Sequence, residues 1–265
     1  MIVDTHTHVW PDELAQRALA GNALPGLHAT GDGTIAGLTS DMAASGVEVS
    51  CCLAIANRGT QVDRVNEFVS GVRADHLFPV GTIHVDLSVE ENLASLQRHG
   101  IVAVKVHPMF QDFALDDRRL WDILGALEDS HIAVITHVGE GGNAHQNSLS
   151  NPAMIREIAR QFPDLSLVAC HFGGFKLFDQ AEEILANTNV ILETSWPPTL
   201  AALRPERVRS LIRRHGAARI VFGSDWPMAQ PHAELRVLDS LGLRDDELDL
   251  VLGTNMARVL GLAST

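Results

Sequence analysis

The chain opens with Met1-Ile-Val-Asp-Thr-His-Thr-His8, the stretch around which the rest of the sequence is organised. The apolar residues before Asp4 are typical of a buried strand, and strand side chains alternate between two faces. Asp4, His6 and His8 are therefore expected on one face. Neutral imidazole is the commonest metal ligand at physiological pH, so the two histidines form a candidate ligand pair. The alternative is two hydrogen-bonded or surface histidines, and the triplet alone does not choose between them.

Seven further apolar segments follow, and helical patterns separate them. Alternating strands and helices indicate a parallel sheet with helical crossovers. Eight units in 265 residues leave about 33 residues each, as in a (β/α)8 barrel. The expected strands are 2–8, 47–57, 78–84, 101–107, 132–137, 165–171, 189–195 and 219–225. We predict an α/β fold, a (β/α)8 TIM barrel that forms one domain over residues 1–265.

Apolar stripes and start and stop signals mark the helices. The clearest apolar stripe is formed by Leu120, Ile123, Leu124 and Leu127. Ser88 and Glu91 form a capping box, Asn151 and Pro152 mark the start of a helix, and Gly253 marks a break between the last two helices. Residues 11–33 and 138–151 are long for connections, and we expect them to be functional loops.

Composition excludes several classes of partner. The formal net charge is -13, and the chain has no basic tract of the kind that binds nucleic acid. No apolar run is long enough to span a bilayer, and no signal peptide is visible. The three cysteines fit no disulfide framework, which favours reduced thiols and a cytoplasmic location.

Metal-competent residues end several of the expected strands, namely His8, His84, His107, His137, His171 and Asp225. In this fold, the carboxyl ends of the strands build the active site. Hydrogen-bonded core histidines account for one or two such positions, but not for a ring of them. Imidazole nitrogens with one carboxylate favour a single Zn²⁺ that keeps a position for water. Ligand type alone also admits Mn²⁺, Fe²⁺ or Ni²⁺.

At these positions the chain resembles the amidohydrolase superfamily, and within it the amidohydrolase-2 branch. That branch includes aminocarboxymuconate-semialdehyde decarboxylase and related metal-dependent hydrolases. The resemblance runs through the whole chain. Its motifs are Thr5-His6-Thr7-His8, Thr136-His137-Val138-Gly139, His171-Phe172-Gly173-Gly174, Phe222-Gly223-Ser224-Asp225-Trp226-Pro227 and Gly253-Thr254-Asn255-Met256-Ala257.

The resemblance implies roles for individual residues. It makes His6, His8, His137 and Asp225 the ligands of one catalytic metal ion. Asp225 would also take a proton from the activated water. His171 would act as a base or electrophile that faces the substrate, with a structural hydrogen-bonded histidine as the alternative.

Lys105 is a charged residue in the fourth expected strand, where its neighbours on both sides are apolar. Three interpretations remain open: it anchors a substrate carboxylate, it is carbamylated and supports a second ion, or it pairs with a carboxylate such as Asp4 or Glu193. We favour the first. Trp10, Trp196 and Trp226 directly follow strand ends. They are expected to bind a planar substrate, with loop packing as the alternative.

These features predict a metal-dependent hydrolase that attacks a small carboxylate-bearing ester, lactone or amide with a metal-activated water. The first alternative is a non-oxidative, metal-dependent decarboxylase (a lyase) of an aromatic or muconate-like acid. An alternative from another class is a metal-binding barrel without catalysis. The expected partner is a small organic acid, and a homodimer is compatible with the sequence.

Overall fold

The computed structural model describes residues 1–21 and 27–262. The strand order in its eight-stranded sheet, β1 to β8, follows the chain. The strands are β1 (Val3–Thr7), β2 (Val49–Leu53), β3 (Leu77–Thr82), β4 (Ala103–Val106), β5 (Ala133–Thr136), β6 (Leu167–Ala169), β7 (Ile191–Glu193) and β8 (Ile220–Val221). Seven lie within the ranges expected from the sequence, and β3 begins one residue earlier.

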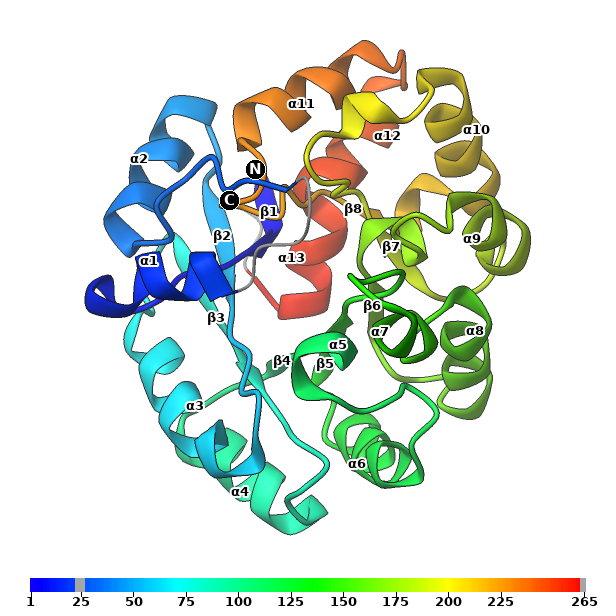
Figure 1. The fold of residues 1–265 in the computed structure, drawn as a ribbon. Helices are drawn as coiled ribbons and strands as arrows, with labels where there is room; N and C mark the ends of the chain where they lie inside the picture. The colour runs from blue at the N-terminus through cyan, green and yellow to red at the C-terminus, as the bar shows by residue number, and fades with distance from the viewer. Residues whose placement is uncertain (22–26, 263–265) are drawn as a thin grey trace. The chain divides into compact units, whose positions relative to one another are not determined.

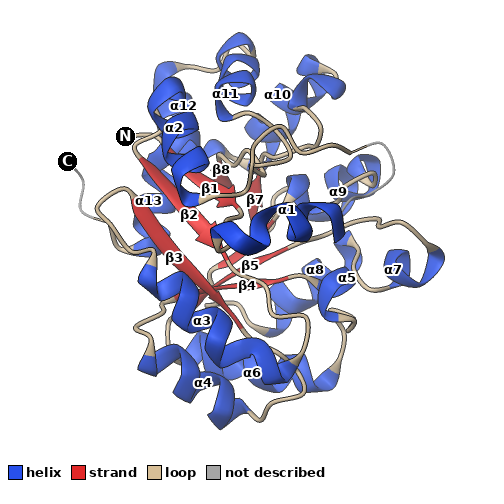
Figure 2. Ribbon diagram, turned by 60° about the vertical axis from the view of Figure 1, so that its left-hand side comes forward, coloured by secondary structure: helices blue, strands red, loops and turns tan. Residues whose placement is uncertain are grey.

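Helices connect the successive strands, as the strands in red and helices in blue of Figure 2 show. They are α1 (Asp12–Gly21), α2 (Ile35–Ser45), α3 (Val62–Gly71), α4 (Val89–Arg98), α5 (Pro108–Gln111), α6 (Arg118–Asp129), α7 (Ala144–Ser148), α8 (Pro152–Gln161), α9 (Phe178–Leu185), α10 (Pro205–His215), α11 (Pro231–Ser240), α12 (Asp245–Asp249) and α13 (Asn255–Leu260). Pairings between neighbouring strands are parallel, and Thr7 of β1 also bridges to Trp226, just after β8. The predicted (β/α)8 barrel is confirmed.

The structure divides into two compact units. Unit 1 comprises Met1–Cys52, Ala74–Phe78 and Glu193–Thr265. It contains β1, β2 up to Cys52, and β8, and α2 packs against α11. Thr194 continues the ladder beyond β7 by donating its N–H to the carbonyl oxygen of Val221 at 3.0 Å. The first and last elements that the structure describes, β1 and α13, both belong to this unit (Figure 1).

Unit 2 comprises Leu53–Arg73 and Pro79–Leu192. The register of β4 and β5 pairs Lys105 with Ile135, and β6 continues the sheet beside β5. Helix α4 packs against both α3 and α6, and these helices lie beside one another in Figures 1 and 2. The apolar stripe of α6 is buried as predicted, at Leu120, Ile123, Leu124 and Leu127.

Local signals explain where several helices start. The Ser88–Glu91 capping box is confirmed, since each residue's side chain accepts the other's backbone N–H. Asn151 caps α8 ahead of Pro152. The expected break at Gly253 is wrong, because a π-helical turn, η5 (Leu250–Thr254), continues the helix there. A Cβ at Gly253 would lie 2.1 Å from the Met1 carbonyl oxygen, so glycine allows close approach of the backbones.

In the described part of the chain, no helix combines the length and the apolar character needed to cross a bilayer.

Candidate active site

Three of the expected metal ligands come together in unit 1. His6 Nε2 lies 3.2 Å from His8 Nε2 and 3.2 Å from Asp225 Oδ1. His8 Nε2 lies 3.6 Å from the same carboxylate oxygen. Two ligands of a tetrahedral ion, each ~2.0–2.2 Å from it, lie roughly 3.3–3.6 Å apart. The three donor atoms therefore fit one first-row divalent ion.

The backbone explains this convergence. His6 and His8 are two residues apart on β1 and directly after it, where the register with β2 shifts between Asp4 and Thr7. Asp225 follows β8 in the left-handed region, with φ 63°. This turn directs its carboxylate to the two imidazoles, and all three residues are at most 9% exposed.

Asp4 joins β1 to the turn that carries Asp225. Its carboxylate accepts hydrogen bonds from Ser224 N (2.9 Å), Ser224 Oγ (2.6 Å) and His6 N (3.1 Å). Burial raises the pKa of Asp4 to about 7, although the hydrogen bonds from Ser224 and His6 act in the opposite direction. Asp4 thus fixes the spacing between the two segments that supply the candidate ligands.

Glu193 orients His6 from the other side. Its Oε2 lies 3.0 Å from His6 Nδ1 and accepts a hydrogen bond from Ser195 Oγ at 2.8 Å. A carboxylate on one ring nitrogen sets the tautomer that presents the other nitrogen to an ion. Gly223 makes room for this carboxylate, since a Cβ there would lie 2.3 Å from Glu193 Oε1.

The other predicted histidines belong to unit 2. His137 follows β5, and its Nδ1 lies 3.0 Å from His171 Nε2. His171 has a left-handed backbone, with φ 58°, in the turn after β6. The His107 ring stacks on that of His137, with centroids 4.4 Å apart and planes 9° apart. Unit 2 thus gathers three buried histidines at the carboxyl ends of β4, β5 and β6.

Lys105 is wholly buried on β4, and its Nζ donates a hydrogen bond to Cys170 Sγ at 3.1 Å. Buried lysine normally requires a polar partner, and the thiol supplies one that the sequence did not indicate. Cys170 itself lies between β6 and His171.

The three tryptophans have different surroundings. Trp10 is partly exposed and stacks on His8, with ring centroids 6.1 Å apart, whereas Trp196 is buried at 8% exposure. Trp226 is fully buried, and its Nε1 donates to Asp41 Oδ2 at 2.7 Å. Trp226 also lies against Gly31, where a Cβ would be 2.6 Å from the indole. This placement favours, for Trp226, the alternative of loop packing over contact with a substrate.

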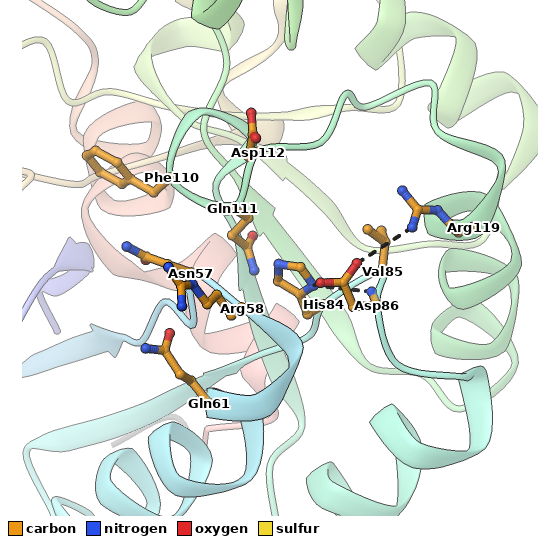
Figure 3. A pocket seen from close by; sticks show the side chains of 10 residues that line it. All are labelled: Asn57, Arg58, Gln61, His84, Val85, Asp86, Phe110, Gln111, Asp112 and Arg119. Carbon is orange, nitrogen blue, oxygen red and sulfur yellow. Dashed lines mark hydrogen bonds and ion pairs between the residues drawn. The ribbon is translucent and has the colours of Figure 1, made fainter.

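A polar pocket of about 790 Å³ lies in unit 2, beyond the ends of β2, β3 and β4. We name it the β2–β4 pocket; Figure 3 shows its lining, Asn57, Arg58, Gln61, His84, Val85, Asp86, Phe110, Gln111, Asp112 and Arg119. Arg58 follows β2 and has no ion pair with another residue in the described part of the chain.

Most of this lining was missed in the sequence. The available signal was positional, because Asn57 ends an expected strand, as the histidines do, and Asp86 and Asp112 follow two others. Polar loop residues are common on any surface, so only the folded chain shows which of them share a pocket.

Several proteins of known structure share this architecture. An uncharacterised TIM-barrel protein, Bb4693 from Bordetella bronchiseptica, is 21% identical over 98% of each chain, with a TM-score of 0.80. A protein from Pseudomonas putida named as a 2-pyrone-4,6-dicarboxylic acid hydrolase is 18% identical over 100% of this chain and 98% of its own (TM-score 0.69). A dihydroxybenzoic acid decarboxylase from Polaromonas sp., with bound manganese and 2-nitroresorcinol, is 13% identical over 100% and 98% (TM-score 0.74).

At these identities the structural likeness establishes a shared fold. No curated protein matches the chain in sequence. The sequence model of the amidohydrolase family (Amidohydro_2), however, matches residues 3–262, nearly the whole chain. The chain therefore belongs to the amidohydrolase family.

Proposed function

We propose that the chain is a metal-dependent hydrolase of a small ester, lactone or amide that bears a carboxylate. The observation that carries this proposal is the convergence of His6, His8 and Asp225 within 3.6 Å of one another. Two imidazoles and a carboxylate at this spacing suit a divalent ion of catalytic type.

His137 is the proposed fourth ligand. Its position directly after β5 and the family's resemblance at Thr136-His137-Val138-Gly139 support this role. Three nitrogens and one oxygen favour Zn²⁺, and the manganese in the Polaromonas protein makes Mn²⁺ the main competitor. When bound, the ion supplies Lewis acidity, which acidifies water and polarises a carbonyl group.

The chain's own residues would then complete the reaction. Asp225 accepts the proton of the attacking water, a role open to a carboxylate beside the ligand nitrogens. His171 donates a hydrogen bond to the oxygen that becomes negative. Lys105 attracts the substrate carboxylate by its charge, and Trp10 and Trp196 contact the planar part of the substrate.

A second candidate is a non-oxidative decarboxylase of an aromatic acid. The likeness in fold to the dihydroxybenzoic acid decarboxylase favours it. Measurement of CO₂ released from ring carboxylic acids, beside hydrolysis of lactones and esters, separates the two activities.

The test of the metal-dependent reaction is the double variant H6A/H8A. It should lose both bound metal, by elemental analysis, and turnover in a screen of lactones, esters and ring carboxylates. The variant Glu48→Gln, at an exposed carboxylate, is the control. Full turnover in a metal-free double variant would end the proposal. We further propose a cytoplasmic protein, consistent with three free cysteines, and a homodimer.

A further inference from the structure

A groove of about 370 Å³ lies within unit 1, and we name it the α11 groove. Its walls come from the residues before β1, the end of α2, one face of α11 and the passage from α12 into η5. Half-buried apolar side chains from these segments line it, namely Ile2, Leu235, Leu248 and Leu252. Apolar side chains that gather in one place, unlike scattered ones, are typical of a surface that binds a partner.

The face of α11 beside this groove carries charges of both signs. His232, Arg236 and Asp239 are exposed and line the groove. Within residues 1–21 and 27–262, these three side chains make no ion pair and no hydrogen bond. Arg236 and Asp239 do not pair with each other either, although residues three apart on a helix are neighbours. The groove therefore has an apolar floor and a rim of charges that are not neutralised within the chain.

We infer that this face of α11 binds a second copy of the chain across a two-fold axis. Positions 232, 235, 236 and 239 share one face of the helix. An axis between Leu235 and Arg236 makes the two α11 helices antiparallel, so that position 232 faces position 239 of the other copy. Asp239 then faces the partner's His232 and lies within one turn of the partner's Arg236. The axis repeats these contacts, and such self-complementarity is what a two-fold interface requires.

The other groups of the groove suit the same partner. Leu235 would pack against the methylene groups of the partner's Arg236, since long charged side chains cover apolar surface with their stems. Ala44 and Ser45, on the α2 side of the groove, are small and uncharged, so they leave room for a helix. Two copies of a chain with a net charge of -13 repel each other. A homodimer therefore needs a face on which charges balance, as they do on α11.

The test is sedimentation velocity of the full chain over a series of concentrations, which measures the dissociation constant of the dimer. Wild type should sediment as a dimer that dissociates on dilution. D239R and R236D each oppose like charges, twice in every dimer, and should raise the dissociation constant about tenfold or more. The double variant R236D/D239R opposes unlike charges again and should recover most of this loss. D122R makes the same change in charge at an exposed aspartate of α6 and should dissociate as wild type does.

A wild type that is monomeric at every concentration would overturn the inference. So would single variants with the wild-type dissociation constant, a double variant no tighter than the single ones, or an equal loss in D122R. Recovery in the double variant excludes misfolding as the cause of the losses, and circular dichroism checks the fold of each protein.

The inference rests on the proposed homodimer but not on the proposed reaction. Ile2 precedes β1, whereas His6 and His8 lie at its other end, so the groove is remote from the candidate ligands. Turnover per chain should therefore be the same in all these variants as in wild type. A dimer that both single variants leave intact would keep the homodimer and remove this face, and loss of the metal proposal would leave the interface standing.

Discussion

His6 Nδ1 lies 3.0 Å from Glu193 Oε2, which joins a candidate metal ligand on β1 to a wholly buried carboxylate at the end of β7. This contact leaves His6 Nε2 facing His8 and Asp225. The geometry of the candidate site therefore depends on a residue that is not itself expected to bind the ion.

Replacement of Glu193 by glutamine should weaken metal binding. Loss of a carboxylate that orients a ligand histidine typically costs about 10–100-fold in metal affinity, and glutamine preserves the shape. Competitive titration of Zn²⁺ and Mn²⁺ against a chelating dye measures the change. Gly223→Ala should act in the same direction, since its Cβ would lie 2.3 Å from Glu193 Oε1. Unchanged affinity in both variants would contradict the orienting role.

Replacement of Asp225 by asparagine should lower turnover by about 10²–10⁴-fold, the usual contribution of a positioned proton acceptor. The amide keeps the size of the side chain but cannot take a proton from water. The rate on the best substrate found by screening is the readout, and bound metal is measured in parallel. D239N changes an exposed aspartate of α11 outside the ligand set and serves as the control. A D225N enzyme with wild-type turnover and full metal content would exclude this role for Asp225.

Replacement of Trp226 by phenylalanine should destabilise the fold. The indole N–H donates to Asp41 Oδ2 at 2.7 Å, and a hydrogen bond to a charged group contributes about 1.5–3 kcal/mol. Denaturant unfolding of W226F, D41A and the double variant gives the coupling between the two residues. Additive effects in that cycle would show that the contact contributes nothing. The Michaelis constant should stay near that of wild type, because Trp226 is buried.

Replacement of Glu234 by glutamine should change how stability depends on pH. Burial raises the pKa of Glu234 above its ordinary 4.5, and the Leu200 N–H that it accepts opposes this shift. The folded state therefore binds the proton more tightly than the unfolded state, and wild-type stability falls as the pH rises from 4.5 through the folded pKa. E234Q carries no such charge, so its Tm should exceed that of wild type more at pH 8 than at pH 5. An identical pH profile for the two proteins would refute the raised pKa.

Some side-chain partners in the folded protein have no signal in the sequence. Lys105 was expected to hold a substrate carboxylate, and that stays a prediction, but its hydrogen bond to Cys170 could not be anticipated. The two residues are 65 positions apart, and strand pairing brings them together through β5. Arg58 is similar, because whether an exposed arginine has a partner depends on the loops that surround it.

The sequence by itself determined the strand order and the residues at the strand ends, because periodicity and helix signals are local properties of the chain. It also placed His6, His8 and Asp225 in one site, because parallel strands bring their carboxyl ends to one edge. Only the tertiary structure decided that Glu193 orients His6, that Trp226 is packed and that Arg58 lacks an acidic partner. Each of these depends on distances between side chains remote in sequence, which no local pattern encodes.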